Sequence, residues 1–235
     1  MLQVKICGIT TVEDAQACVA AGADAIGLNF FAQSPRFVSP AAAAEIARAI
    51  PAGVAKVGVF VNADARKIHQ IWREVGFDLV QLHGDEPSYL VAELAAGGLP
   101  PVVRAFRLDS RGLGPILEYL QACRRLGCQL VATLLDAAVA GSYGGTGATS
   151  DWAIAASYPS NEGYPPLVLA GGLTPENVGE AIRRVLPQAV DTASGVESSP
   201  GRKDPAKLRA FVEAARAALA GTSRLTTEAR RRGER

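Results

Sequence analysis

Two residues of this chain have the type and the position to move protons. Cys7 ends the first apolar run, in VKICGIT, and Asp136 ends a later one, in LLDA. A thiolate can take a proton as a general base, and a protonated carboxyl group can give one as a general acid. Each also has an ordinary explanation, because a cysteine among apolar residues is usually a small buried side chain and an aspartate after a strand usually caps a turn. Their shared position, at the end of a predicted strand, favours a catalytic pair.

The segment after Asp136 weakens its explanation as a cap. The next helix is predicted to begin only near 150, and residues 141–149, GSYGGTGAT, form a glycine-rich loop before it. The P-loop pattern GxxxxGK[ST] does not fit this loop, because it would need glycine at Ser142 and lysine at Ala148. Long loops after barrel strands tend to be functional, so we predict a lid that covers a substrate.

Two other glycine segments indicate a phosphate site. Gly171 and Gly172 lie in LAGGLTP, and Ser194 and Gly195 lie in DTASGVE. Glycines let backbone N–H groups approach an anion closely, and barrels commonly hold phosphate in the loops after strands seven and eight. One glycine pair alone would indicate a tight turn, whereas two such segments at these two places predict phosphate binding.

Arg36 follows two phenylalanines in NFFAQSPRFV, the segment after the second predicted strand. A loop arginine is usually solvated, but a cation in a partly apolar pocket suits an aromatic carboxylate. His83, in QLHGDE, is equally well explained as a hydrogen-bonded structural residue and as a participant in the site.

The elements that must position these residues alternate between short apolar runs and alanine-rich stretches of helical period. The predicted strands are about 2–7, 24–29, 54–61, 78–82, 101–106, 129–135, 166–170 and 188–192. The predicted helices are about 11–21, 40–50, 64–75, 87–96, 114–126, 150–157, 175–186 and 204–219. Three helix starts are supported by a proline near the first turn, at Ser39-Pro40, Glu86-Pro87 and Thr174-Pro175.

Eight strand–helix units without a linker predict one α/β domain, a single closed (β/α)8 TIM barrel over residues 1–221. A doubly wound open sheet is the alternative, and it too places ligands beyond the carboxyl ends of its strands. Because side chains alternate along a strand, Lys5 and Cys7 are expected in the barrel lumen, with Val4 and Ile6 facing the helices.

The composition argues against several classes of partner. The chain has 235 residues and a formal net charge of +1, so it has no overall field to attract nucleic acid or a membrane surface. No signal-peptide pattern opens the chain and no apolar stretch is long enough to span a bilayer, which predicts a cytoplasmic protein. The cysteines lack CxxC spacing and the histidines lack partners at metal-ligand spacing, so we expect free thiols and no metal site. Residues 222–235 have no apolar period and predict a disordered tail.

Eight segments, in the same order along the chain, resemble the phosphoribosylanthranilate isomerase family of tryptophan biosynthesis. They are KICGIT, NFFAQSPRFV, VGVFVN, VQLHGDE, LLDA, GGTGATSDW, LAGGLTPENV and DTASGVESSPGRKD. The resemblance covers nearly the whole chain apart from the tail. It implies a (β/α)8 barrel that carries out an Amadori rearrangement without a cofactor, converting N-(5-phosphoribosyl)anthranilate into 1-(2-carboxyphenylamino)-1-deoxyribulose 5-phosphate. Whether the protein is a monomer or a homodimer stays open.

The resemblance also implies roles for individual residues. Cys7 corresponds to the general base of the family and Asp136 to its general acid. Arg36 would bind the anthranilate carboxylate, and Asp191 would lie near the sugar hydroxyls. Phosphate binding is implied for the four loop residues Gly171, Gly172, Ser194 and Gly195.

Two other functions compete with this interpretation. The related isomerase of histidine biosynthesis, or an enzyme acting on both substrates, has an aspartate where Cys7 stands, which argues against it. A barrel that only binds a phosphosugar and regulates a partner would need neither Cys7 nor Asp136. The chain departs from the family at Ala148, where lysine is frequent, and at Thr192-Ala193, and we expect these changes to affect affinity rather than chemistry.

Overall fold

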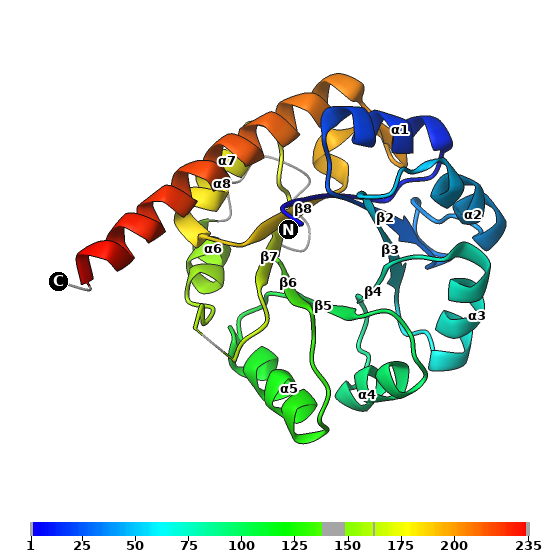
Figure 1. Ribbon diagram of the computed structural model, residues 1–235, viewed down its shortest axis with the longest axis horizontal. Helices are drawn as coiled ribbons and strands as arrows, with labels where there is room; N and C mark the ends of the chain where they lie inside the picture. Colours follow the sequence, from blue (N-terminus) through cyan, green and yellow to red (C-terminus); the bar gives the residue numbers. More distant parts are fainter. Residues whose placement is uncertain (1, 138–148, 162, 234–235) are drawn as a thin grey trace.

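The computed structural model describes residues 2–137, 149–161 and 163–233. Eight parallel strands close into one barrel in chain order, and the helices surround it (Figure 1). Strand β1 (Val4–Cys7) pairs with both β2 (Ala25–Asn29) and β8 (Ala189–Thr192). The predicted (β/α)8 barrel is therefore confirmed, and the alternative of an open sheet is excluded.

The remaining elements follow the predicted alternation. The other strands are β3 (Ala55–Phe60), β4 (Leu79–Leu82), β5 (Val102–Arg107), β6 (Ala132–Asp136) and β7 (Leu167–Ala170). The helices are α1 (Val12–Ala21), α2 (Pro40–Ala49), α3 (Ala65–Val75), α4 (Ser88–Ala96), α5 (Gly114–Arg125), α6 (Thr149–Ala156), α7 (Val178–Val185) and α8 (Pro205–Gly233).

The predicted start of α7 at Thr174-Pro175 is wrong, because the helix begins at Val178. The side chain of Asn177 explains the delay: its Oδ1 accepts a hydrogen bond from the Thr174 N–H (2.8 Å) and its Nδ2 donates to the Gly172 carbonyl (2.9 Å). These bonds hold 174–177 as a turn, and the helix starts only after it.

The first strand orients its side chains as predicted. Val4 and Ile6 are buried in the layer between strands and helices. Lys5 lies on the opposite face, where its ammonium contacts Asp191, its register partner on β8. The lumen therefore holds charged groups directly beneath the rim at which Cys7 ends the strand.

A short segment between β8 and α8 was not predicted. It forms a 3-10 turn, η1 (Ser194–Val196), and a small antiparallel hairpin of β9 (Glu197–Ser199) and β10 (Arg202–Lys203). These strands are too short to show a periodic pattern in the sequence. The Thr10 hydroxyl donates to the Gly201 carbonyl (2.7 Å), which ties the hairpin to the loop after β1.

Helix α8 extends beyond its predicted end near 219 and continues to Gly233, away from the barrel (Figure 1). The residues after Gly221 are mainly Arg, Thr, Glu, Ala and Leu, without proline, so nothing in the sequence stops the helix there. The division into a barrel domain of 1–221 and a separate tail of 222–235 stays a prediction. No helix in the described ranges is long and apolar enough to cross a membrane.

Candidate active site

Cys7 and Asp136 end two strands of the same parallel barrel. Cys7 is the last residue of β1 and Asp136 the last of β6, and both are partly exposed. All strands of such a barrel end at one face, which is where enzymes of this architecture place their catalytic residues. The fold thus brings the two predicted proton-transfer groups to one rim.

Strand β2 makes room for the thiol with a glycine. Gly27 is the register partner of Cys7. A Cβ atom at Gly27 would lie 2.6 Å from Cys7 Sγ and 3.2 Å from Lys5 Nζ. A larger residue at this position would displace the thiol or the ammonium, so the glycine allows both groups to occupy the lumen together.

Burial and the charges around Cys7 together set its protonation. Burial raises the pKa of the Cys7 thiol above its usual value, and the nearby Lys5 ammonium only partly opposes this effect. Burial alone would lower the pKa of Lys5, but the Asp191 carboxylate, 2.9 Å from its Nζ, raises it overall. Lys5 and Asp191 therefore form a buried ion pair, and Cys7 is a neutral thiol at pH 7 when no ligand is bound.

This protonation can be measured by alkylation. Because a raised pKa moves thiolate formation to higher pH, we expect the rate of Cys7 alkylation by iodoacetamide to be low at pH 7. It should then rise about tenfold per pH unit toward pH 9. Lys5→Met removes a cation that stabilises the thiolate, so it should slow alkylation at pH 9. A rate that is already at its plateau by pH 7 would contradict this assignment.

Asp191 was predicted to lie near the sugar hydroxyls. The structure places it in the buried pair with Lys5, and its carboxylate is largely inaccessible. A contact with the substrate stays a prediction, and the contact that the structure shows is to the lysine beneath Cys7.

On the other side of the barrel, Asp136 faces His83. Oδ2 of Asp136 lies 3.7 Å from Nε2 of His83, and the buried Gln81 side chain approaches Nδ1 of the same ring at 3.1 Å. The atom of Gln81 that faces Nδ1 is the amide Nε2, and the donor and acceptor roles in this contact depend on the tautomer of the ring. His83 thus lies between Gln81 and Asp136 at the rim, whereas the sequence left its place open between a structural role and the site.

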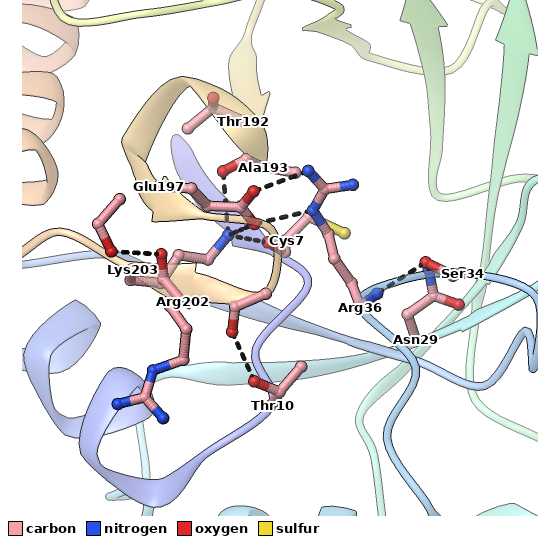
Figure 2. Close-up of polar contacts among 12 residues, drawn as sticks. Cys7, Thr10, Asn29, Ser34, Arg36, Thr192, Ala193, Glu197, Arg202 and Lys203 are labelled. Atoms are coloured by element: carbon pink, nitrogen blue, oxygen red, sulfur yellow. Dashed lines mark hydrogen bonds and ion pairs between the residues drawn. The ribbon is translucent and has the colours of Figure 1, made fainter.

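Arg36 lies above the end of β1 and is paired with a carboxylate from the unpredicted hairpin. Its Nε and Nη2 donate to Oε1 (2.8 Å) and Oε2 (2.7 Å) of Glu197, as Figure 2 shows. Gly8 has a φ of +76° and a Cβ there would collide with the Cδ atom of Arg36. The glycine after Cys7 is therefore needed both for its backbone conformation and for the position of the arginine.

Lys203 is a site residue that the sequence reasoning missed. Its side chain is fully buried, and Nζ donates to the carbonyls of Cys7 (2.7 Å) and Ala193 (3.0 Å) and to Oε1 of Glu197 (2.9 Å) (Figure 2). Lysine in GRKD reads as a solvated surface residue. Glu197 and Lys203 both belong to the last of the eight segments that resemble the family. Nothing in that segment indicates that the two side chains contact each other.

The two predicted phosphate loops lie against each other. The Thr192 hydroxyl donates to the Leu173 carbonyl (2.7 Å), and a Cβ at Gly195 would collide with that same carbonyl. Gly171 and Gly172 both have positive φ, +92° and +61°, which glycine adopts without strain. The structure therefore brings the loops after β7 and β8 together, and their contact with phosphate stays a prediction.

The predicted lid, residues 141–149 with Ala148, lies outside the described residues except for Thr149, at which α6 begins. The four cysteines are free thiols. Within the described ranges no group of three or more His, Cys, Asp or Glu side chains is placed to hold a metal ion.

With its ionisable residues gathered at the carboxyl ends of the strands, the molecule falls into the class of (β/α)8-barrel enzymes. A family model described as N-(5'phosphoribosyl)anthranilate (PRA) isomerase matches residues 4–214. The N-(5'-phosphoribosyl)anthranilate isomerase of Geobacter metallireducens is 46% identical over 218 residues, covering 92% of this chain and 100% of the relative. The chain belongs to the N-(5'-phosphoribosyl)anthranilate isomerase family.

Solved structures agree with this membership. Phosphoribosyl anthranilate isomerase from Thermotoga maritima matches with a TM-score of 0.80 and 39% identity, over 92% of this chain and 100% of that one. A second structure of such an isomerase, in complex with reduced 1-(o-carboxyphenylamino)-1-deoxyribulose 5-phosphate, matches with a TM-score of 0.77 and 37% identity. It too covers 92% of this chain and 100% of its own.

Proposed function

We propose that this protein converts N-(5-phosphoribosyl)anthranilate into 1-(2-carboxyphenylamino)-1-deoxyribulose 5-phosphate in tryptophan biosynthesis, with Cys7 as general base and Asp136 as general acid. The observation that carries the proposal is the placement of these two residues at the ends of β1 and β6 of one barrel, in a chain of this family. A complex of a related isomerase with the reduced product supports the substrate class.

The chemistry requires one acid and one base. Protonation of the furanose oxygen, assigned to Asp136, opens the ring and leaves a Schiff base. Removal of the proton on C2′, assigned to Cys7, gives an enolamine, which tautomerises to the ketone. The sum is an isomerisation, so no oxidant or reductant is consumed. The Lys5 ammonium beneath Cys7 favours the thiolate that the second step needs.

The remaining site residues are assigned to binding. Arg36 binds the anthranilate carboxylate, Asp191 lies near the sugar hydroxyls, and the loops with Gly171, Gly172, Ser194 and Gly195 bind the phosphate. The adjacency of these two loops supports a single phosphate site, because donors from both can reach one anion. A cytoplasmic location and the choice between monomer and homodimer stay predictions from the sequence.

The direct test is a fluorescence assay. Phosphoribosylanthranilate is generated in situ, the protein is added, and the loss of anthranilate-type emission is followed. Rapid decay with the wild type and none with Cys7→Ser would support both the reaction and the base. Folded protein that binds the reduced product but gives no decay would favour a binding protein instead.

Arg36 can be tested separately from the proton-transfer residues. We expect Arg36→Ala to raise KM by about 10- to 100-fold while kcat changes much less, because the guanidinium is assigned to the carboxylate of the substrate and to no reacting atom. Lys203 still balances the charge of Glu197 in this variant, so the fold should be retained. An unchanged KM in steady-state kinetics would remove Arg36 from the carboxylate site.

A further inference from the structure

A single buried ammonium links three parts of the candidate site. Nζ of Lys203 contacts the carbonyl of Cys7 at the end of β1, the carbonyl of Ala193 after β8, and the carboxylate of Glu197 on β9. Its side chain is 0% exposed. Burying an ammonium costs free energy unless it is paired. A fully buried lysine with this set of contacts therefore indicates a role beyond filling space.

Glu197 is the residue that joins this ammonium to Arg36. Its carboxylate accepts both guanidinium bonds and the Lys203 bond, and its side chain is only 5% exposed (Figure 2). Burial alone would raise the pKa of Glu197, but hydrogen bonds from Arg36 and Lys203 hold it below its usual value. The carboxylate is therefore ionised at neutral pH, and the three side chains together carry one net positive charge.

Other charged groups nearby do not change this balance directly. Asp14 of α1 contacts Lys203 through the backbone N–H (3.2 Å), and the exposed Lys207 contacts Glu197 through its carbonyl (2.9 Å). Asp191 is paired with Lys5. Within the part of the chain that the structure describes, the side-chain ion pairs of Glu197 are thus with Arg36 and Lys203.

We propose that Lys203 sets the charge of the carboxylate-binding site: by balancing Glu197, it leaves the positive charge of Arg36 available to the carboxylate of the substrate. Glu197 orients the guanidinium, and Lys203 prevents that orientation from neutralising it. Lys203 is then a positioning residue that determines specificity for a carboxylated substrate. This inference rests on the proposed function, in which Arg36 binds the anthranilate carboxylate.

The physical argument is a charge count in a poorly solvated site. Without the lysine, Arg36 and Glu197 form a neutral pair, and a carboxylate that approaches Arg36 is repelled by the unbalanced carboxylate of Glu197. Between like charges in a site of low dielectric this repulsion is far stronger than in water. With the lysine, the incoming carboxylate completes a set of two cations and two anions.

The test is a binding experiment with two probes. One is reduced 1-(o-carboxyphenylamino)-1-deoxyribulose 5-phosphate, and the other is its anilino counterpart, which lacks the carboxylate. Calorimetry gives both dissociation constants. The Kd of the anilino probe divided by the Kd of the carboxylated probe isolates the contribution of the carboxylate, and this quotient is the ratio used below. We expect Lys203→Met to reduce this ratio at least ~10-fold, because the site loses its net charge.

Removing the negative charge as well separates this role from a purely structural one. Lys203→Met combined with Glu197→Gln restores one net positive charge, so we expect the double variant to recover most of the lost ratio. Lys207→Met removes an exposed lysine that contacts the same glutamate through its backbone, and it should leave the ratio unchanged. An unchanged ratio in Lys203→Met, or a double variant no better than the single one, would overturn the proposal.

Two outcomes keep the test decisive. If Lys203→Met does not fold, Glu197→Gln alone decides: a ratio equal to or above that of the wild type supports the charge count, and a lower ratio contradicts it. If the wild type binds neither probe, the proposed function fails, whereas wild-type binding with an unaffected Lys203→Met ratio refutes only the role of Lys203.

Discussion

Replacing Cys7 with alanine is expected to lower kcat at least ~100-fold while the protein remains folded, because general acid–base groups typically contribute that much. The side chain is partly exposed at the rim and its removal leaves the Lys5–Asp191 pair intact, so the ion pair beneath it continues to hold the strands. Steady-state assays of the purified variant give kcat, and circular dichroism checks the fold.

Cys18 provides the matched control for this change. It is fully buried on α1, and burial raises the pKa of its thiol to about 12, so it cannot serve as a base at neutral pH. Cys18→Ala should leave kcat within about threefold of the wild type and lower the thermal stability, since it leaves a small cavity. If both variants lose activity equally, or if Cys7→Ala keeps its rate, the assignment of Cys7 as the base is wrong.

Replacing Asp136 with asparagine is expected to lower kcat to a similar extent, at least ~100-fold, with a much smaller effect on KM. The amide has nearly the same shape as the carboxyl group but cannot pass a proton to the furanose oxygen. His83 still offers a ring nitrogen toward position 136, so the side chain should keep its place. Pre-steady-state measurements that separate ring opening from product release would show whether the slow step is the protonation.

Asp109 allows the same chemical change without the expected effect. It lies on the loop after β5, is paired with Arg111 (2.6 Å) and is about half exposed. Asp109→Asn should leave kcat and KM near the wild-type values, because it lies outside the proposed acid–base pair. Unchanged turnover in Asp136→Asn would transfer the acid role to another group, with His83 the first to examine.

Much of the fold could be predicted because its signals are local. The alternation of apolar runs and helical stretches, with Ser39-Pro40 at a helix start, depends on residues close together in the chain, and Ser39 indeed caps α2. The start of α7 was misplaced because the side chain of Asn177 holds a turn that the proline at 175 does not reveal. The hairpin β9–β10 gave no signal, since its strands are shorter than any periodic pattern.

Only some residues of the candidate site gave a local signal in the sequence. Cys7, Asp136 and Arg36 could be proposed from their places at or after strand ends and from the resemblance of the surrounding segments. Glu197 and Lys203 could not, since a charged residue in a loop is normally solvated and only its contacts reveal otherwise. Asp191 was predicted only to lie near the sugar hydroxyls, and its pairing with Lys5 was not foreseen.

By itself, the sequence determined the repeated strand–helix order, the family, and the two residues proposed for proton transfer. Only the tertiary structure decided which charges are buried and how they are paired. The pairs Lys5–Asp191 and Arg36–Glu197 join residues 186 and 161 positions apart, and the contact of Lys203 with the Cys7 carbonyl spans 196 positions. Periodicity is set by neighbours within a few residues, whereas a buried charge is stabilised by partners that only the closure of the barrel brings near.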